Sequence, residues 1–330
     1  MIFLPSRFFD ETDCILIIGS NVREEAPIIN SRIRKQTLNR NISIASIGEN
    51  YDMTYEHDYL GNNLNVLEEL LSEKNQFSKK LINAKNPMII IGQAVLNRED
   101  SLKVFSILEQ IITKFKISNN DWNGVNILQI AASRVGALDM GLYQKAKSLS
   151  DIYEEAKNGK IKLLLSFGAD EIDYANFNKC NIVYIGTHGD SGANNANIIL
   201  PAAAYTEKDA IYINTEGRLQ YANKANFPPN ESREDWKIVN QISEVLNLGW
   251  NIISLDDVRS QICQKFPLLF EDVKSVYSQL LANRPEEFIF KNSEISPIIK
   301  DFYINNTISR FSETMSECSR ARQELRKSVS

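Results

Sequence analysis

The segment Gly186-Thr187-His188-Gly189-Asp190-Ser191-Gly192 places an imidazole and a carboxylate two residues apart in a glycine-rich stretch. A carboxylate beside a histidine raises the pKa of the imidazole and fixes its tautomer, so His188 and Asp190 could act as a proton-transfer pair. The same residues are also typical of turns in which short polar side chains cap backbone groups, and we favour that interpretation. The segment follows an apolar run, so we expect it at the carboxyl end of a strand, where open α/β sheets bind ligands.

A second short loop, Gly19-Ser20-Asn21, lies between the apolar run 14–18 and a helical pattern. Backbone N–H groups in such a loop could bind a phosphate at the start of the helix. Every connection from a strand to a helix needs residues of this kind, however, and we favour the structural interpretation. We expect Glu24 and Glu25 in the first turn of that helix, where negative charge favours the helix dipole.

Two charged clusters, Glu207-Lys208-Asp209 and Glu216-Gly217-Arg218, could polarise a substrate. Solvated or mutually paired charges are the more common role for such residues. Together with the two loops they do not make a catalytic set, and we expect no catalytic residue in this chain.

The cysteines and histidines limit the metal chemistry that is open to the chain. The cysteines are Cys14, Cys180, Cys263 and Cys318. No two of them form the close pair that zinc sites and iron–sulfur clusters usually take from one loop. His57 and His188 are the only histidines, and neither belongs to an H-E-x-x-H motif. The P-loop, the G-x-G-x-x-G fingerprint and the G-x-S-x-G elbow are absent as well, and we expect no metal site.

Composition excludes several classes of protein. The chain has 330 residues, with 37 basic against 42 acidic side chains and a pI near 5.4, which argues against nucleic-acid binding. Its longest apolar runs are far shorter than the roughly 20 residues that span a bilayer. The amino terminus lacks the layout of a secretory signal, and it begins as a mature cytoplasmic or organelle-encoded protein would.

Apolar runs alternate with helical patterns along the chain. A short alternating strand is expected over 211–214, and the longer, apolar strands are expected at 14–18, 42–47, 87–92, 161–167 and 181–185. Because these runs barely alternate in polarity, they predict an α/β fold with parallel sheets flanked by helices, followed by an irregular C-terminal tail. We also expect a helix over 232–246 with Ser232 as its N-cap.

This pattern predicts three segments. Residues 1–120 form a first α/β subdomain, and residues 121–250 form a second, which carries the His-Gly-Asp and Tyr-Thr-Glu-Lys loops. Residues 251–330 form a helical C-terminal segment that packs on a partner or on the core, because its end is polar and lacks a core of its own.

Several segments together resemble one family, the large iron–sulfur subunit of respiratory complex I, which is the G subunit of NADH-quinone oxidoreductase. The resemblance covers about residues 10 to 320. Its motifs are 17–27, 186–193, 199–208, 214–218, 300–303, 308–310, Met315 and Cys318. The loop and Leu-Pro segments are shared with molybdopterin oxidoreductases at large, whereas the Tyr-Thr-Glu-Lys run at 205–208 and the Asp-Phe-Tyr run at 301–303 point to complex I.

The resemblance implies a molybdopterin-oxidoreductase-like fold that has lost its pterin and serves as a scaffold in the peripheral, NADH-oxidising arm. Gly19, Ser20, Asn21, His188 and Asp190 would then line a vestigial cleft, with no cofactor bound in this chain. The cysteine-rich region with which the family usually begins is missing here. The resemblance therefore implies a C-terminal part whose iron–sulfur clusters lie on a separate N-terminal chain. Other peripheral-arm subunits would be partners, on the matrix side of the mitochondrial inner membrane or the cytoplasmic side of a bacterial one.

Two other functions stay open at this point. In a fragment of an active molybdopterin oxidoreductase, such as a formate dehydrogenase, the loops at Gly19 and His188 would hold a pterin-guanine dinucleotide. A stand-alone soluble binding protein is the third possibility, and the polar tail argues against it, because that tail suggests a surface normally covered by a partner.

Overall fold

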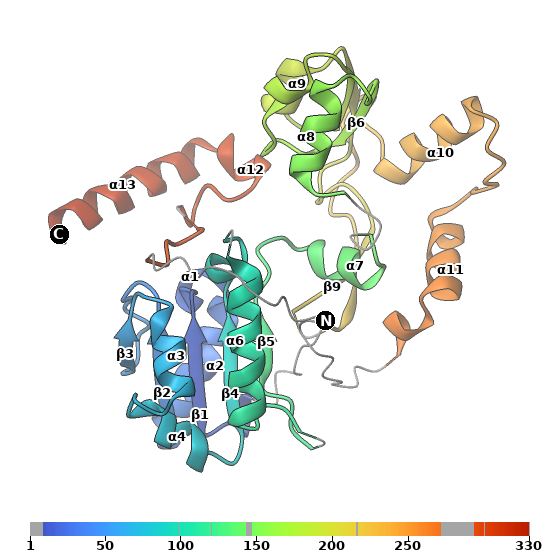
Figure 1. Cartoon of the computed structure of the whole chain (residues 1–330). Helices are drawn as coiled ribbons and strands as arrows, with labels where there is room; N and C mark the ends of the chain where they lie inside the picture. Colours follow the sequence, from blue (N-terminus) through green and yellow to red (C-terminus); the bar gives the residue numbers. More distant parts are fainter. Residues whose placement is uncertain are drawn as a thin grey trace. The chain divides into compact units, whose positions relative to one another are not determined.

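The computed structural model (Figure 1) describes residues 9–98, 100–119, 121–142, 147–215, 217–271, 294–299 and 301–329. Glu216 and Lys300, which belong to motifs of the sequence analysis, lie outside these ranges. Contacts divide the chain into two compact units. The described residues within 1–139, 213–218 and 272–300 form unit 1, and those within 140–212, 219–271 and 301–330 form unit 2. The three segments expected from the sequence stay a prediction.

Unit 1 is built on a five-stranded parallel sheet with the strand order β3-β2-β1-β4-β5. The strands are β1 (Cys14–Ile18), β2 (Ser43–Ile47), β3 (Asp58–Gly61), β4 (Pro87–Ile91) and β5 (Val125–Ile127). Every residue of β1 and β4 is buried, which explains why their sequences are uniformly apolar rather than alternating.

Helices cover both faces of this sheet (Figure 1). In the described ranges, the helices of unit 1 are α1 (Val22–Glu25), α2 (Pro27–Asn39), α3 (Asn65–Leu71), α4 (Phe77–Asn83), α5 (Gln93–Leu96), α6 (Ser101–Lys114) and α7 (Arg134–Asp139). Leu16 packs in one core with α3, α4 and α6, while Ile17 packs in the other with Ile33 of α2. Burying each such side chain contributes about 1.5–3 kcal/mol, so the two cores fix the sheet between its helices.

Pro27 divides what the sequence pattern suggests is a single helix. Ala26 takes a non-helical conformation, with φ −146° and ψ 66°, because the proline ring disfavours a helical residue before it. The acidic pair Glu24 and Glu25 therefore belongs to the short helix α1 and not to the first turn of α2. The expectation that this pair stabilises the dipole of the long helix was wrong.

Unit 2 contains a three-stranded parallel sheet with the order β6-β7-β8. Its strands are β6 (Leu163–Phe167), β7 (Asn181–Gly186) and β8 (Ile198–Pro201). Helix α8 (Leu149–Lys157), the 3-10 helix η2 (Tyr174–Phe177) and the short helix α9 (Ser191–Asn195) precede or follow these strands. A capping box formed by Ser148 and Asp151 begins α8.

The remainder of unit 2 consists of helices and loops, and it carries most of a two-stranded ribbon, of which Ile213 belongs to unit 1. The ribbon pairs β9 (Ala210–Ile213) with β10 (Leu219–Ala222). The helices are α10 (Asp235–Val245), α11 (Leu255–Lys265), η3 (Pro267–Phe270), α12 (Thr307–Arg310) and α13 (Glu313–Val329). The C-terminal tail thus ends in a 17-residue helix. No helix in the described ranges combines the length and apolarity that crossing a bilayer requires.

Helix α10 begins later than the sequence predicts. Its N-cap is Glu234, and Ser232 does not cap it. Arg233 forms a parallel bridge with Ala202, in which its amide donates to Pro201 at 3.1 Å and its carbonyl accepts from Ala203 at 2.8 Å. This pairing holds Arg233 extended, so the helix cannot start at Ser232.

Candidate functional site

The first candidate site is the carboxyl edge of the five-stranded sheet in unit 1. Strand order reverses between β1 and β4, and open α/β sheets bind ligands in the crevice at this point. Gly19, Ser20 and Asn21 follow β1 directly, as the sequence predicts, and Gly92 follows β4. The Gly92 amide donates to the Ile18 carbonyl at 2.8 Å.

The two loops touch at this edge through their backbones. Gly19 has a φ of +61°, and a β-carbon placed on Gly92 would overlap the Gly19 carbonyl group, lying 2.7 Å from its carbon atom. A β-carbon on Gly19 would in turn lie 2.7 Å from the side chain of Val95. Glycine is therefore required at both positions, and no ligand fits between the loops.

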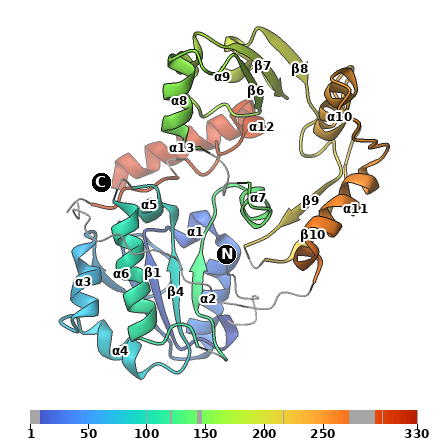
Figure 2. The same ribbon diagram turned by 45° about the vertical axis from the view of Figure 1, so that its right-hand side comes forward.

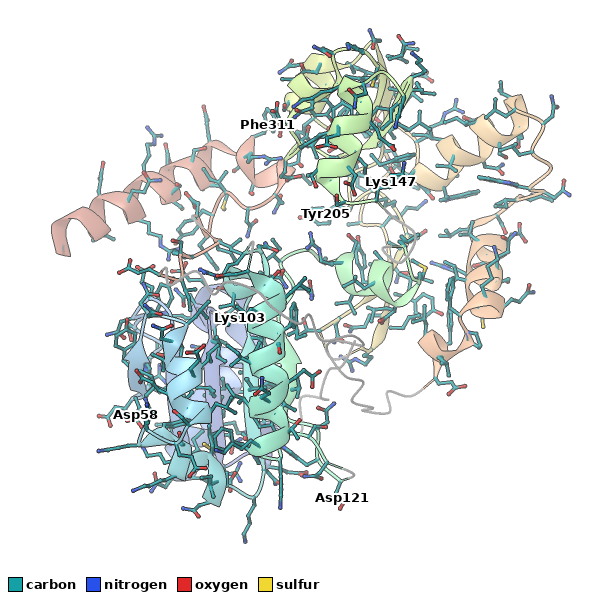
Figure 3. All side chains as sticks on the ribbon, viewed as in Figure 1. Asp58, Lys103, Asp121, Lys147, Tyr205 and Phe311 are labelled. Carbon is teal, nitrogen blue, oxygen red and sulfur yellow. The ribbon has the colours of Figure 1, made fainter. Side chains whose placement is uncertain are left out.

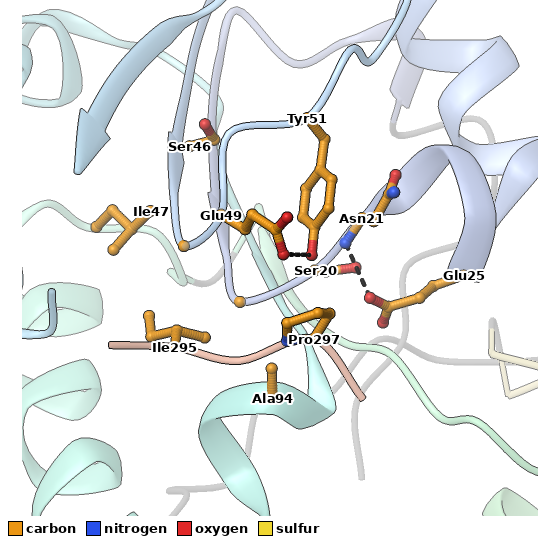
Figure 4. A pocket seen from close by; sticks show the side chains of 12 residues that line it. Ser20, Asn21, Glu25, Ser46, Ile47, Glu49, Tyr51, Ala94, Ile295 and Pro297 are labelled. Atoms are coloured by element: carbon orange, nitrogen blue, oxygen red, sulfur yellow. Dashed lines mark hydrogen bonds between the residues drawn. The ribbon is translucent and has the colours of Figure 1, made fainter. Parts of the chain in front are cut away.

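A distant segment of the chain closes the rest of the crevice (Figure 4). Ile295 is buried against this edge, and its amide donates to the backbone carbonyl of Asn62 at 3.3 Å and to its side chain at 3.2 Å. Ile295 and Pro297 line a cavity of about 10 Å³ together with Ser20, Asn21 and Glu25. That volume holds about one water molecule.

The carboxylate of Glu25 binds a backbone amide of this loop. It accepts a hydrogen bond from the Asn21 amide at 2.8 Å (Figure 4). Burial raises the pKa of the Glu25 carboxyl above its ordinary value of 4.5, and the hydrogen bond from Asn21 partly offsets that shift. The Asn21 amide of this loop thus has a hydrogen-bond acceptor in the side chain of Glu25, which lies on the adjacent helix α1.

The raised pKa of Glu25 predicts a pH effect with a definite sign. Because the folded state favours the protonated form, Glu25 adds most to stability below pH 4.5, and this contribution is lost as pH rises through the folded pKa. Glu25→Gln is neutral at every pH and keeps an acceptor for Asn21. We expect the variant to gain stability relative to the native chain between pH 4 and pH 7, measured by urea unfolding.

The control for this comparison is Glu11→Gln, which removes an exposed carboxylate from the same unit. A native chain that gains stability over Glu25→Gln as the pH rises would contradict the assignment.

The second candidate site is the loop that follows β7 in unit 2. The side chains of His188 and Asp190 bind different partners. His188 Nδ1 lies 2.9 Å from Thr187 Oγ1, and its ring stacks on Phe311 with centroids 5.0 Å apart. Asp190 accepts from the Ser191 amide at 2.8 Å and caps α9, as the turn interpretation expects.

Helix α12 and the residue after it contact this loop through an ion pair as well as through ring stacking. Arg310, the last residue of α12, lies 2.8 Å from Asp190 and 3.8 Å from Glu171. Phe311, labelled in Figure 3, follows it directly and supplies the ring on which His188 stacks. The two adjacent residues hold the loop against α12.

Arg310→Ala should loosen this attachment. A charged hydrogen bond that is partly exposed contributes about 1 kcal/mol, so we expect amide exchange in residues 188–194 to rise about fivefold. Hydrogen–deuterium exchange measured by mass spectrometry tests this. Arg320→Ala, on the exposed surface of α13, is the matched control. Equal exchange in the two variants would contradict the proposed attachment.

The Tyr-Thr-Glu-Lys run has structural partners. Glu207 accepts from the Ala204 amide at 2.9 Å, and Lys208 forms an ion pair with Asp235 at the start of α10. Asp209 accepts from the Lys224 amide at 2.9 Å. The expectation that these charges are structurally paired is confirmed, and Glu216 lies outside the described residues.

A larger hollow, of about 260 Å³, lies at the carboxyl ends of β6 and β7. Among the residues that line it, Asp170 has both oxygens engaged, since it accepts from the Tyr184 hydroxyl and the Gly192 amide, each at 2.9 Å. Burial and the bond to Asp170 raise the pKa of the Tyr184 phenol. Lys208 and Asp235 line the hollow as an ion pair, so its polar groups bind one another.

The comparisons with known proteins agree with this fold. Residues 5–245 match the molybdopterin oxidoreductase family. The chain belongs to that family. Residues 278–318 match the C-terminal region of the G subunit of NADH-ubiquinone oxidoreductase, which confirms the predicted resemblance to the carboxyl-terminal part of this subunit.

Relatives of this molybdopterin oxidoreductase family member are complex I subunits. The chain is 39% identical to the NADH-ubiquinone oxidoreductase 75 kDa subunit of Reclinomonas americana, over 96% of the chain and 46% of the relative. It is 35% identical to the G subunit of NADH-quinone oxidoreductase from Rickettsia bellii, over 96% and 45%. With the mitochondrial 78 kDa subunit of Neurospora crassa the identity is 36%, over 95% and 42%. The chain thus spans less than half the length of these relatives.

One solved structure is similar to the chain at low sequence identity. Acetylene hydratase from Pelobacter acetylenicus matches with a TM-score of 0.47 and 10% identity, over 81% of this chain and 49% of that one.

The crevice at Gly19 does not fit the pterin that the molybdopterin oxidoreductase family name implies, because its cavity has room for about one water molecule. Within the described ranges, no group of three or more histidine, cysteine or acidic side chains could hold a metal ion.

Three important residues escaped sequence reasoning. Asp170 follows β6 in Gly168-Ala169-Asp170, a position at the carboxyl end of a strand that could have signalled its role. Ile295 and Asn62 lie more than 200 residues apart, and no local sequence pattern predicts that they are in contact.

Proposed function

We propose that this chain is a non-redox structural part of the peripheral, NADH-oxidising arm of respiratory complex I. The observation that carries the proposal is the closed crevice at the switch point of unit 1, where Ile295 and the Gly19–Gly92 contact take the space of a ligand. Open α/β sheets bind ligands in the crevice at the switch point, so we would expect an active enzyme of this family to keep that space open. A scaffold gains stability from filling it.

The clusters that carry electrons from NADH to quinone would lie on a separate polypeptide. Relatives extend over more than twice the matched length, and the cysteines of this chain are free and mutually distant. We propose that this second polypeptide is the iron–sulfur half of the same subunit and that other peripheral-arm subunits are further partners. The assembly would face the matrix of a mitochondrion or the cytoplasm of a bacterium.

Native purification of the tagged chain tests the proposal. We expect mass spectrometry to find complex I subunits, among them a cysteine-rich iron–sulfur chain, and elemental analysis to find iron without molybdenum. Iron should leave the sample when the second chain is removed.

Stoichiometric molybdenum in the absence of complex I subunits would overturn this proposal. It would favour the alternative function, a part of an active molybdopterin oxidoreductase such as a formate dehydrogenase. The loops at Gly19 and His188 would then have to open to admit a pterin.

A further inference from the structure

The strand β6 is an unprotected edge of its sheet. Among the described residues it pairs with β7 and leaves its other side open. Its sequence, Leu163-Leu164-Leu165-Ser166-Phe167, contains no charge, no proline and no bulge. Such an edge exposes backbone N–H and C=O groups to which another strand can bind.

The other edge strands of the two parallel sheets have features that discourage pairing with a further strand. The edge strand β3 has a register shift against β2 and begins with Asp58, which is paired with Lys80; Figure 3 labels Asp58. The strand β5 has three residues, and β8 ends in Pro201. Short strands, charges, bulges and prolines are the usual protections of a free edge, and β6 has none of them.

The face of the sheet beside this edge is apolar and exposed. Leu165 pairs with Val183, and Val183 pairs with Ile198, so the side chains of these three residues lie on one face of the sheet. Side chains alternate along a strand, so Leu163 and Phe167 of β6 lie on the same face as Leu165. Leu163, Leu165, Phe167 and Ile198 are 54%, 42%, 46% and 55% exposed. We call these four residues the β6 face.

Neighbouring helices leave the β6 face uncovered. On the opposite face, Leu164 and Ile182 pack with α8 and η2, and Figure 2 shows α8 beside β6 and β7. On the same face, Ile238 and Ile242 of α10 pack with Val183 and Ile185 of β7 and with Leu200 and Ala202, so α10 covers part of β7 but leaves the four residues of the β6 face exposed. Parallel sheets are almost always covered on both faces, so a cover for the β6 face is missing from the described part of the chain.

We infer that the edge of β6 and the β6 face receive an extended apolar segment from the polypeptide that corresponds to the unmatched half of the relatives. The inference rests on the proposed function, which makes that polypeptide a separate chain. More than half of each relative lies outside the match, whereas nearly all of this chain lies inside it. Added main-chain hydrogen bonds would supply affinity, and the leucine and phenylalanine side chains would supply the apolar contact.

A charge on the β6 face tests this inference. Leu165→Lys places an ammonium in the middle of the face, and its exposure allows the side chain to reach water without disturbing the fold. We expect at least tenfold less of the iron–sulfur chain to co-purify with the tagged variant than with the native chain. The matched control is Leu38→Lys, because Leu38 is 76% exposed and lies on α2, a helix of unit 1.

The two proposals fail differently in this experiment. If the native chain brings down complex I subunits and Leu165→Lys brings down the iron–sulfur chain equally well, the inference is wrong and the proposed function stands. If the native chain brings down no such subunit, both are wrong.

A photo-crosslink gives a second readout that does not depend on a variant's stability. Phe167 is replaced by benzoylphenylalanine, an aromatic residue of similar shape, in the assembled complex. We expect a crosslink to the iron–sulfur chain. A crosslink to this chain itself, either within one copy or between two copies, would overturn the inference. The control position is Phe227, an exposed site outside the β6 face. If benzoylphenylalanine at Phe227 gave the same crosslinked product as at Phe167, the inference would also be wrong.

Discussion

Gly92→Ala is expected to destabilise unit 1 by more than about 4 kcal/mol, which places it among the largest effects of single substitutions. The new β-carbon would overlap the carbonyl group of Gly19 and lie 2.7 Å from the β-carbon of Ser20. Neither neighbour can move away, because β1 and β4 are hydrogen-bonded in register up to Ile18 and Ile91. Urea unfolding followed by circular dichroism measures the loss.

The control for this experiment is Gly136→Ala. A β-carbon at Gly136 would contact only the side chain of Ile213, at an ordinary 3.8 Å, and Gly136 lies within α7. Alanine there should be neutral or should stabilise the chain by up to about 1 kcal/mol, since it favours a helix over glycine. If the two alanine variants had the same stability, the direct contact between the Gly19 and Gly92 loops would be disproved.

The thiol of Cys14 should react about a thousandfold more slowly than an ordinary cysteine. Burial, with a smaller contribution from the charge of Asp13, raises the pKa of the Cys14 thiol from 9.0 to about 12. Three pKa units reduce the thiolate about a thousandfold at neutral pH, and the thiolate is the reactive form. Cys263 lies exposed on α11 and serves as the comparison within the same molecule.

Timed alkylation with iodoacetamide, read by mass spectrometry of peptides, tests this expectation. Cys263 should be modified early and Cys14 only when the chain is unfolded in concentrated guanidinium. Cys263→Ser should remove the fast phase and leave Cys14 unreactive. Modification of Cys14 within tenfold of the rate at Cys263 would show that β1 is not buried as described.

The central strands of the two parallel sheets could be predicted because they are largely apolar. These strands, β1 and β4 in unit 1 and β7 in unit 2, are long enough to stand out from their surroundings. The edge strands β3 and β5 were not predicted, since Asp58–Gly61 and Val125–Ile127 are short and contain polar residues. Such segments become strands because a neighbouring strand offers them hydrogen bonds, and that information is not local.

The sequence predicted where the loops of the candidate sites lie but not which residues contact them. The positions of Gly19 and His188 after apolar strands were readable from the sequence. The partners that engage these loops, Ile295 for one and Arg310 for the other, come from more than 100 residues away. Only the folded chain identifies them.

The docking of Ile295 also sets an order of events during synthesis. All five strands of the unit 1 sheet are complete by residue 127, long before residue 295 is made. At roughly 5–20 residues per second, the interval lasts on the order of 10–30 seconds. During that interval, the nascent chain on the ribosome contains all five strands of the sheet but not yet Ile295. Chaperones and small molecules therefore meet the edge at Gly19 and Gly92 before Ile295 covers it, a form that the finished protein no longer presents.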